Sequence, residues 1–314
     1  MPSQDQISSR LKLRDLRLLL EVAERGSMAK AATRLNMTQS GVSRAIAELE
    51  HALGVSLFDR MAQGVEPTPY GLALLKGSVA IFDELRRSIE AIEHLADPQS
   101  GELRLGCTEP MSWGIVPEII NRLVRKYPRL SFQVVQGDPA RLRFAELGER
   151  RIELALCAIT AAVPVDDIDT EILFDERRFI VASADSHWVK RRQIKLSDLA
   201  DEPWAIPTHE SPARTILEDA YRANGLPPPR ITVVNFSLPL QIALLSGGHF
   251  LTVFPQSMLR FCAKRMSLRT LPIELPARPA PVGIITLKNR TISPIARLFI
   301  EQARIVSKPL ADRR

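Results

Sequence analysis

Apolar side chains recur at helical spacing in three short runs near the start of the chain. The first run predicts a helix over about residues 12–24, which Gly26 ends. The second predicts a short helix capped by Ser27, with one apolar stripe formed by Met28, Ala31, Ala32 and Leu35. The third predicts a helix over residues 38–51 with a narrow apolar stripe formed by Val42, Ile46, Leu49 and Leu53. The small break between the second and third runs indicates a helix-turn-helix.

The third helix leaves one side almost bare of apolar residues. That side carries short hydroxyl side chains at Ser40 and Ser43, with Gln39 and Arg44 in its N-terminal half. Short side chains let a helix approach a DNA duplex closely, and glutamine or arginine reaches base edges or phosphates. We therefore interpret this helix as one that enters a major groove of double-stranded DNA. A helical pair whose outer face is merely solvated is the alternative that the pattern leaves open.

Two short apolar segments after the third helix predict a pair of strands. The first covers residues 57–60 and ends on a basic side chain, Arg60, and the second follows a turn within residues 63–68. A two-stranded wing beside a recognition helix adds contacts to the DNA backbone through such basic residues. The wing therefore favours the DNA-binding interpretation over the solvated one.

A single long helix is predicted next, because Pro69 suits a first helical turn and no further proline occurs before Pro98. Apolar side chains recur along it at steps of three and four residues, which gives a heptad-like seam over roughly 40 Å. Such a seam must be buried against its own chain or against a partner. The seam comprises Leu72, Leu75, Val79, Phe82, Leu85, Ile89, Ile92 and Leu95.

The remaining two thirds alternate between strand and helix patterns, which predicts parallel sheets with helices on their faces. The expected first set has strands over residues 102–107, 131–135 and 152–159 and helices over residues 117–127 and 140–149. The second set has strands over residues 171–182, 204–207, 230–234 and 250–254 and helices over residues 213–224 and 238–246. Strands over residues 268–273 and 282–287 and a helix over residues 293–306 follow. We expect two α/β lobes with a crevice between them.

Polar residues that follow the predicted strands are the candidates for ligand binding in this crevice. Ligands of such sheets bind beyond the carboxyl ends of the strands, and hydroxyls, amides and helix N-termini suit a small polar or anionic molecule. Each residue taken singly has an ordinary role as a helix cap or loop residue as its alternative. The candidates chosen by position are Thr108, Ser112, Gly137, Asp138, Ala158, Thr208, Ser211, Asn235 and Ser237.

Composition excludes several classes of protein. The chain of 314 residues is long enough for two domains, and it has neither a signal-peptide-like start nor an apolar run that would cross a membrane. We therefore expect a cytoplasmic protein without a membrane partner. The five histidines and three cysteines show no metal spacing. A redox switch between Cys107 and Cys157 is an alternative to their being small buried apolar residues.

Net charge does not locate a DNA-binding surface. The total is +6, but residues 261–314 carry eleven Lys/Arg against three Asp/Glu, whereas residues 1–70 carry nine against eight. The DNA-binding interpretation of the N-terminal residues therefore depends on geometry and not on bulk charge.

The first seventy residues resemble the winged helix-turn-helix of LysR-type transcriptional regulators. The shared residues include Ser27, Ala31-Ala32, Thr38-Gln39-Ser40, Val42-Ser43-Arg44, Leu53-Gly54-Val55, Leu57-Phe58-Asp59-Arg60 and Pro67-Thr68-Pro69-Tyr70-Gly71. Ser40 stands where many members have proline. The C-terminal part is more loosely similar to the family's effector domain, which is related to type II periplasmic binding proteins. The second lobe shares Gly247-Gly248 and Leu251-Thr252-Val253-Phe254-Pro255.

This resemblance implies a domain order and a set of functional residues. Residues 1–68 would form the all-α winged head, residues 69–97 a linker and dimerisation helix, and residues 98–314 a two-lobed α/β effector-binding domain. Lobe I would cover about residues 98–168 and 268–306, and lobe II about residues 169–267. DNA contacts are expected from Ser27, Arg34, Thr38, Gln39, Ser40, Ser43, Arg44 and Arg60. Paired helices would form a dimer through Leu72 to Ile89, and two dimers a tetramer.

The implied function is a regulator that is not an enzyme and needs neither a metal nor a cofactor. Its partners would be double-stranded DNA, a small-molecule effector and, as a further candidate, RNA polymerase. Residues 28–32 and 63–67 resemble a subgroup that regulates a galactose-binding protein, so a sugar-related effector is expected. The alternatives are a small-molecule binding protein or α/β enzyme, or an assembly protein built around the long helix. No nucleophile–base pair and no phosphate-binding loop supports the enzyme.

Overall fold

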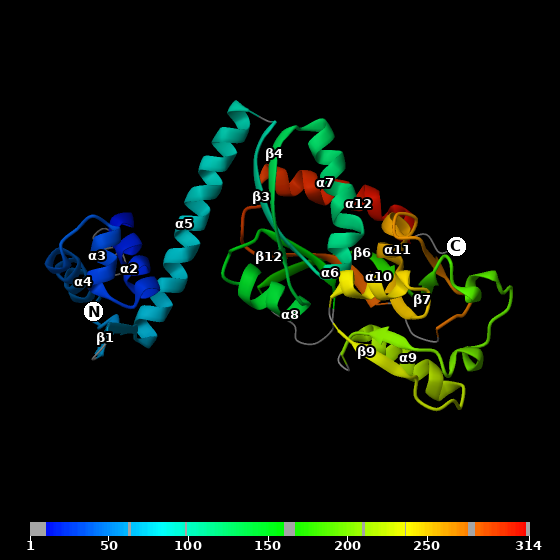
Figure 1. Cartoon of the computed structure of the whole chain (residues 1–314). Coiled ribbons are helices and arrows are strands. Elements are labelled where there is room, and N and C mark those ends of the chain that lie inside the picture. The colour runs from blue at the N-terminus through cyan, green and yellow to red at the C-terminus, as the bar shows by residue number, and fades with distance from the viewer. Residues whose placement is uncertain are drawn as a thin grey trace. The chain divides into compact units, whose positions relative to one another are not determined.

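The computed structural model describes residues 11–61, 64–97, 99–159, 167–208, 211–235, 237–275 and 280–311 (Figure 1). The chain divides into two compact units, Met1–Ile89 and Glu90–Arg314. The first contains the head and most of the long helix, and the second contains both lobes. The long helix is continuous, so the boundary between the units falls within it rather than at either end.

The head is built from three helices, α2 (Leu13–Arg25), α3 (Met28–Arg34) and α4 (Gln39–Leu53). Their apolar stripes meet in one core, in which Leu19, Ala31 and Val42 are completely buried. Asn36, between α3 and α4, has a φ of 52°, the left-handed conformation that asparagine tolerates. The predicted helix-turn-helix is therefore confirmed.

The predicted wing forms strands β1 (Phe58–Met61) and β2 (Gly64–Pro67), which pair antiparallel. The amide of Val65 donates to the carbonyl of Gly26, so β2 lies against the turn between α2 and α3. A Cβ on Gly64 would lie 2.2 Å from the Gly26 oxygen, and its φ is 149°. Only glycine fits this contact between the wing and the helices.

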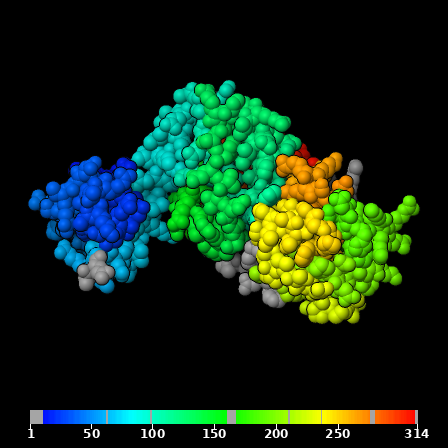
Figure 2. All heavy atoms as spheres, viewed as in Figure 1, coloured from blue at the N-terminus to red at the C-terminus, as the bar shows by residue number. Residues whose placement is uncertain are grey.

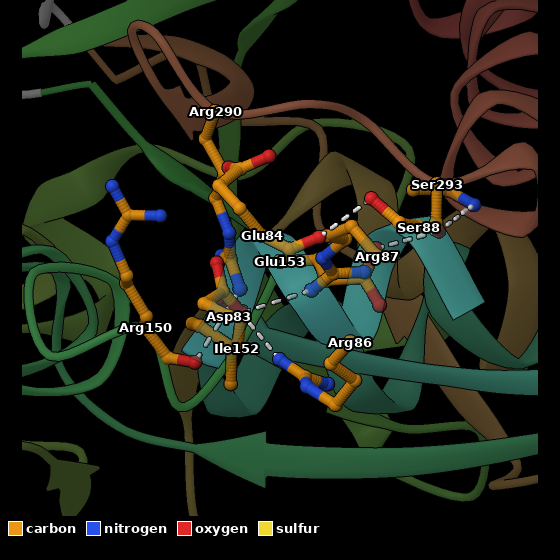
Figure 3. Close-up of polar contacts among 11 residues, drawn as sticks. Asp83, Glu84, Arg86, Arg87, Ser88, Arg150, Ile152, Glu153, Arg290 and Ser293 are labelled. Carbon is orange, nitrogen blue, oxygen red and sulfur yellow. Dashed lines mark hydrogen bonds and ion pairs between the residues drawn. The ribbon is translucent and has the colours of Figure 1, made fainter. Parts of the chain in front are cut away.

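The long helix α5 (Pro69–Ala96) starts directly from the wing. The Thr68 hydroxyl donates to the carbonyl of Ser56 and accepts the amide of Gly71. Leu74 and Leu75 pack against the core of the head. One turn and more beyond them, Asp83 lies within ion-pair distance of Arg86 and Arg87 of the same helix (Figure 3).

The sheet of lobe I has the strand order β4-β3-β5-β12-β6. Its strands are β3 (Ser100–Cys107), β4 (Arg129–Gln136), β5 (Leu154–Ala158), β6 (Ile168–Glu176) and β12 (Ala280–Leu287). β3 is parallel to both β4 and β5, whereas β12 is antiparallel to β5 and β6. The sheet is therefore mixed, and the prediction of a purely parallel sheet is wrong at β12, which returns from the other lobe.

Helices cover both faces of this sheet. The helices α7 (Ile115–Lys126) and α12 (Pro294–Ala311) pack on one face. The opposite face is covered by α8 (Pro139–Arg141) and the π-helical turn η1 (Leu142–Leu147), which replace the helix predicted over residues 140–149. Ser293 caps α12, and its hydroxyl donates to Glu153 at 2.6 Å, while Arg290 donates to the carbonyl of Ile152 (Figure 3).

Lobe II has two small sheets. An antiparallel sheet has the order β10-β7-β11, from β10 (Thr252–Pro255), β7 (Arg178–Ser183) and β11 (Leu268–Thr270). A parallel pair consists of β8 (Trp204–Ile206) and β9 (Ile231–Val234). The helices are α9 (Pro212–Ala223), α10 (Leu238–Ser246) and α11 (Gln256–Cys262), with 3-10 turns η2 (His187–Lys190) and η3 (Leu196–Leu199). α10 and α11 share a core, and Figure 2 shows their segments side by side.

The lobe boundaries differ from those predicted. The strand predicted over residues 171–182 is two strands, because β6 belongs to the sheet of lobe I and β7 to that of lobe II, with only Arg177 between them. β11 belongs to lobe II, although residue 268 was expected to begin the return to lobe I. Alternating apolar residues continue through both crossings without a turn signal, so the pattern alone cannot locate the change of sheet.

Candidate DNA-binding surface and effector crevice

The outer side of α4 is open in this chain. Thr38, Gln39, Ser40 and Arg44 are exposed, and Ser43 is half-buried. Val42, Ile46 and Leu49 are buried on the opposite side. The recognition surface therefore presents short polar groups at the start of a helix whose other side is fixed in the core.

Helix caps position the N-termini that would face phosphates. The Ser27 hydroxyl accepts the amide of Lys30 at the start of α3, as predicted. The Thr38 hydroxyl accepts the amide of Gly41 at 3.1 Å and lies 3.2 Å from the hydroxyl of Ser40. Both caps leave the remaining amides of the first helical turn available for an anion.

Three of the expected DNA-contacting residues are arginines with exposed side chains, Arg34, Arg44 and Arg60. Arg34 ends α3, Arg44 is on α4 and Arg60 is on the wing strand β1. None of them forms an ion pair with another residue in the part of the chain that the structure describes. Cations that are not neutralised internally are free to contact phosphates or base edges.

Sequence reasoning missed the residue that joins the recognition helix to the wing. Glu50, on α4, accepts the amides of Leu57 at 2.7 Å and Phe58 at 3.3 Å with one carboxylate oxygen. This contact fixes the start of β1 relative to α4. A carboxylate on the inner side of α4 close to the wing was the available signal.

The exposed apolar side of α5 lies mainly in its C-terminal half. Leu85 and Ile89 of the predicted seam are exposed, as are Ile92 and Leu95, with Leu95 83% exposed. Ile81, which the prediction omitted, is 45% exposed on the same side. Of the other predicted positions, Leu72 is exposed, Val79 and Phe82 are half-buried, and Leu75 packs on the head.

The lobe I candidates lie near one edge of its sheet, where the parallel strands β3, β4 and β5 end. The amide of Gly137 donates to the carbonyl of Cys107, and that of Thr108 to the carbonyl of Leu156. The Ser112 hydroxyl donates to the carbonyl of Glu109 and accepts the side chain of Gln136 at 2.6 Å. Two other candidates complete this edge: Asp138 caps α8, and Ala158 ends β5.

The lobe II candidates lie where β8 and β9 end. Ser211 caps α9 and Ser237 caps α10, while the amide of Ser211 donates to the carbonyl of Thr208. The amide of Asn235 donates to the carbonyl of Ile206. Its side-chain amide is enclosed, and neither polar atom has a hydrogen-bond partner among the described residues.

Two carboxylates that sequence reasoning did not assign to the crevice join the lobes. Glu109, in the first turn of α6 (Glu109–Trp113), accepts the amide of Leu238 at 3.1 Å. Glu176, at the end of β6, accepts both the amide and the hydroxyl of Ser257 on α11, at 3.0 and 2.5 Å. Burial raises the pKa of Glu176 above its usual value. Both pairs are far apart in the sequence, so no local pattern could reveal them.

The two cysteines proposed as a redox pair face opposite sides of the sheet. Cys107 packs with the core beneath α7 and α12, and Cys157 packs with the core beneath η1. Burial raises the pKa of Cys107 to about 12 and that of Cys157 to about 11. A thiol that stays protonated and faces away from its neighbour is a poor redox sensor, so the small apolar interpretation holds.

Two searches of the described residues bear on the classes considered. No group of three or more His, Cys, Asp or Glu side chains there could hold a metal ion. No helix in those ranges is long and apolar enough to cross a membrane.

Family comparisons cover nearly the whole chain. Residues 13–72 match the family described as "Bacterial regulatory helix-turn-helix protein, lysR family". Residues 96–307 match the family described as "LysR substrate binding domain". These two matches coincide with the head and with the two-lobed unit.

Full-length relatives have the same organisation. The chain is 28% identical to the HTH-type transcriptional regulator GbpR of Azospirillum brasilense, over 98% of this chain and 90% of the relative. It is 29% identical to the transcriptional dual regulator GltC of Bacillus subtilis (strain 168), over 93% and 96%. Full-length CbnR in complex with its target DNA has a similar fold, with a TM-score of 0.53 and 22% identity over 95% and 100% of the two chains. These relatives are regulators rather than enzymes, and the chain belongs to the LysR family of DNA-binding transcriptional regulators with an effector-binding domain.

Proposed function

We propose that α4 is the recognition helix and enters a major groove of double-stranded DNA. Gln39, Ser40, Ser43 and Arg44 would face the base edges. Ser27, Arg34, Thr38 and Arg60 would contact the phosphates on either side. The single observation that supports this assignment is the open polar side of α4, opposite a buried stripe.

Binding of the full-length protein to DNA from upstream of its own gene tests this proposal. Arg44→Ala should weaken binding to the preferred sequence by about 1–3 kcal/mol if the side chain reads a base. If Arg44 contacts only a phosphate, the slope of log K against log salt should fall by about 0.9. Arg125→Ala, which removes an exposed arginine from α7, is the matched control and should change neither quantity. Unchanged affinity and slope for Arg44→Ala would contradict the assignment.

We propose further that the exposed apolar side of α5 pairs with the same helix of a second copy. Ile81, Leu85, Ile89, Ile92 and Leu95 follow one another at steps of four and three residues, as a helix–helix seam requires. Two copies would place two recognition helices on a two-fold DNA site. Association of two dimers into a tetramer and contact with RNA polymerase remain predictions of the family resemblance.

The effector is proposed to bind where the carboxyl ends of the strands of the two lobes meet. Thr108 and Ser112 would contribute hydroxyls, Gly137 a backbone amide, and Asn235 its unpaired side-chain amide. Asp138, Ala158, Thr208, Ser211 and Ser237 would line the same edges, although the side chains of Asp138, Ser211 and Ser237 already cap helices. A sugar-related effector remains a prediction from the sequence, and the cytoplasm is the proposed location, because the DNA is there.

A further inference from the structure

The N-terminus of α10 already holds a carboxylate in this structure. Glu109 belongs to lobe I, yet its side chain accepts the first amide of α10 in lobe II, that of Leu238, at 3.1 Å. The amides at a helix N-terminus and the helix dipole favour negative charge at this position. Glu109 is half-buried and directly follows the crevice candidate Thr108. The protein therefore places an anion of its own at the point where the lobes meet.

Two amide side chains beside this contact lack hydrogen-bond partners. Asn235 lies two residues before Ser237, the cap of α10, and both of its polar side-chain atoms are enclosed and unpaired among the described residues. Gln241 is only 2% exposed, and its Nε2 atom is likewise unpaired. Gln241 lies three residues after Leu238 on the buried side of α10, and helical side chains lean toward the helix N-terminus. An enclosed amide donor without an acceptor costs about 1–3 kcal/mol.

We propose that Glu109 is an internal anion that closes the crevice in the ligand-free protein and that a carboxylate-bearing effector displaces. This inference rests on the proposed effector site and names both the ligand class and the regulation of that site. The effector carboxylate would accept the Leu238 amide in place of Glu109, and its other oxygen would satisfy the donors of Asn235 and Gln241. Displacement of Glu109 breaks a bond between the lobes, which couples ligand binding to their relative position.

Competition for one site gives the proposal a measurable consequence. While Glu109 occupies the N-terminus of α10, only the fraction of molecules with the site open binds an external carboxylate, so the apparent affinity falls by that fraction. Removing the side chain should restore the intrinsic affinity. A neutral ligand of the same shape gains nothing from the vacated site, because the attraction is to negative charge.

Thermal unfolding of the full-length protein in sodium acetate, at an ionic strength held constant with sodium chloride, tests this consequence. In Glu109→Ala the rise of Tm should reach its midpoint at an acetate concentration about tenfold lower than in the wild type. Glu109→Gln should lie between them, because its oxygen still accepts the Leu238 amide but carries no charge. This second variant also decides the matter if Glu109→Ala fails to fold. Acetamide, the neutral counterpart of acetate, should have no effect on any of these proteins.

Glu118→Ala is the matched control, because it removes an exposed carboxylate of α7 that pairs with Arg122. It should respond to acetate like the wild type. Equal acetate midpoints in wild type and both Glu109 variants, an equal response to acetamide, or no acetate response in any protein would each overturn the proposal. Loss of DNA binding by the wild type in a gel shift would instead overturn the proposed function and leave the acetate comparison unchanged.

Discussion

The head and the two-lobed unit present polar groups at helix N-termini in opposite ways. On α4, Ser40 and Arg44 are exposed, and neither is engaged in the core of the head. At the edges of the lobes, Asp138, Ser211 and Ser237 are bonded to their own helices as caps. A surface for DNA can thus be complete before its partner arrives, whereas a site for an effector has to exchange internal hydrogen bonds for external ones. Such an exchange is what allows ligand binding to change the protein.

The largest effect is expected from the apolar side of α5, because it would connect two complete heads. Leu85→Glu together with Ile92→Glu should convert the dimer to a monomer. DNA affinity should then fall by about 100-fold or more, since two linked heads bind with a higher effective concentration than one. Light scattering and a gel shift measure the two results. Val124→Glu, at a 38% exposed apolar position of α7, is the control. A dimeric double variant with normal DNA affinity would contradict the proposed seam.

A smaller loss is expected where α5 meets the wing. A Cβ on Gly71 would lie 2.1 Å from the carbonyl oxygen of Leu57, so Gly71→Ala must displace backbone. The free energy of unfolding of the head should fall by about 1–3 kcal/mol, the usual cost of overpacking. Gly77→Ala on the same helix meets nothing within 4 Å and should instead stabilise the helix by up to about 1 kcal/mol. Chemical denaturation compares the two variants, and equal effects would show that the contact is not tight.

How far the sequence predicts these structures follows the same division. The head depends on contacts between neighbouring segments, so the caps Ser27 and Thr38 and the buried stripe of α4 are all found by spacing alone. In the lobes, the bonds of Glu109 to Leu238 and of Glu176 to Ser257 join residues 129 and 81 positions apart. No periodic pattern carries that information. The crossing at Arg177 was missed for the same reason, because a strand that changes sheets keeps its alternation.

A pH-dependent effect is expected at the hinge between the lobes. The pKa of Glu176 is raised by burial, so the folded state binds its proton more tightly than the unfolded state does. This contribution to stability is complete below the usual pKa of about 4.5 and is lost as pH rises through the folded value. The stability of Glu176→Gln relative to wild type should therefore increase as pH rises above about 4.5. Asp175→Asn, at an exposed neighbouring carboxyl, provides the comparison. A stability difference that is constant with pH would contradict the raised pKa.

The smallest effect is expected at the cysteines. Because the pKa of Cys107 is raised to about 12 and that of Cys157 to about 11, both thiols should react very slowly with a disulfide reagent in the native protein at neutral pH. Cys107→Ser should leave DNA binding equally insensitive to peroxide. Fast labelling, or peroxide sensitivity that this substitution abolishes, would restore the redox alternative.

The central claim is that the open side of α4 reads DNA sequence. Selection of preferred sites from a random DNA pool by the wild type and by Gln39→Ala and Arg44→Ala tests it most directly. The claim predicts that each substitution relaxes the base preference at specific positions of both half-sites while the rest of the motif is kept. An unchanged motif in both variants would contradict it.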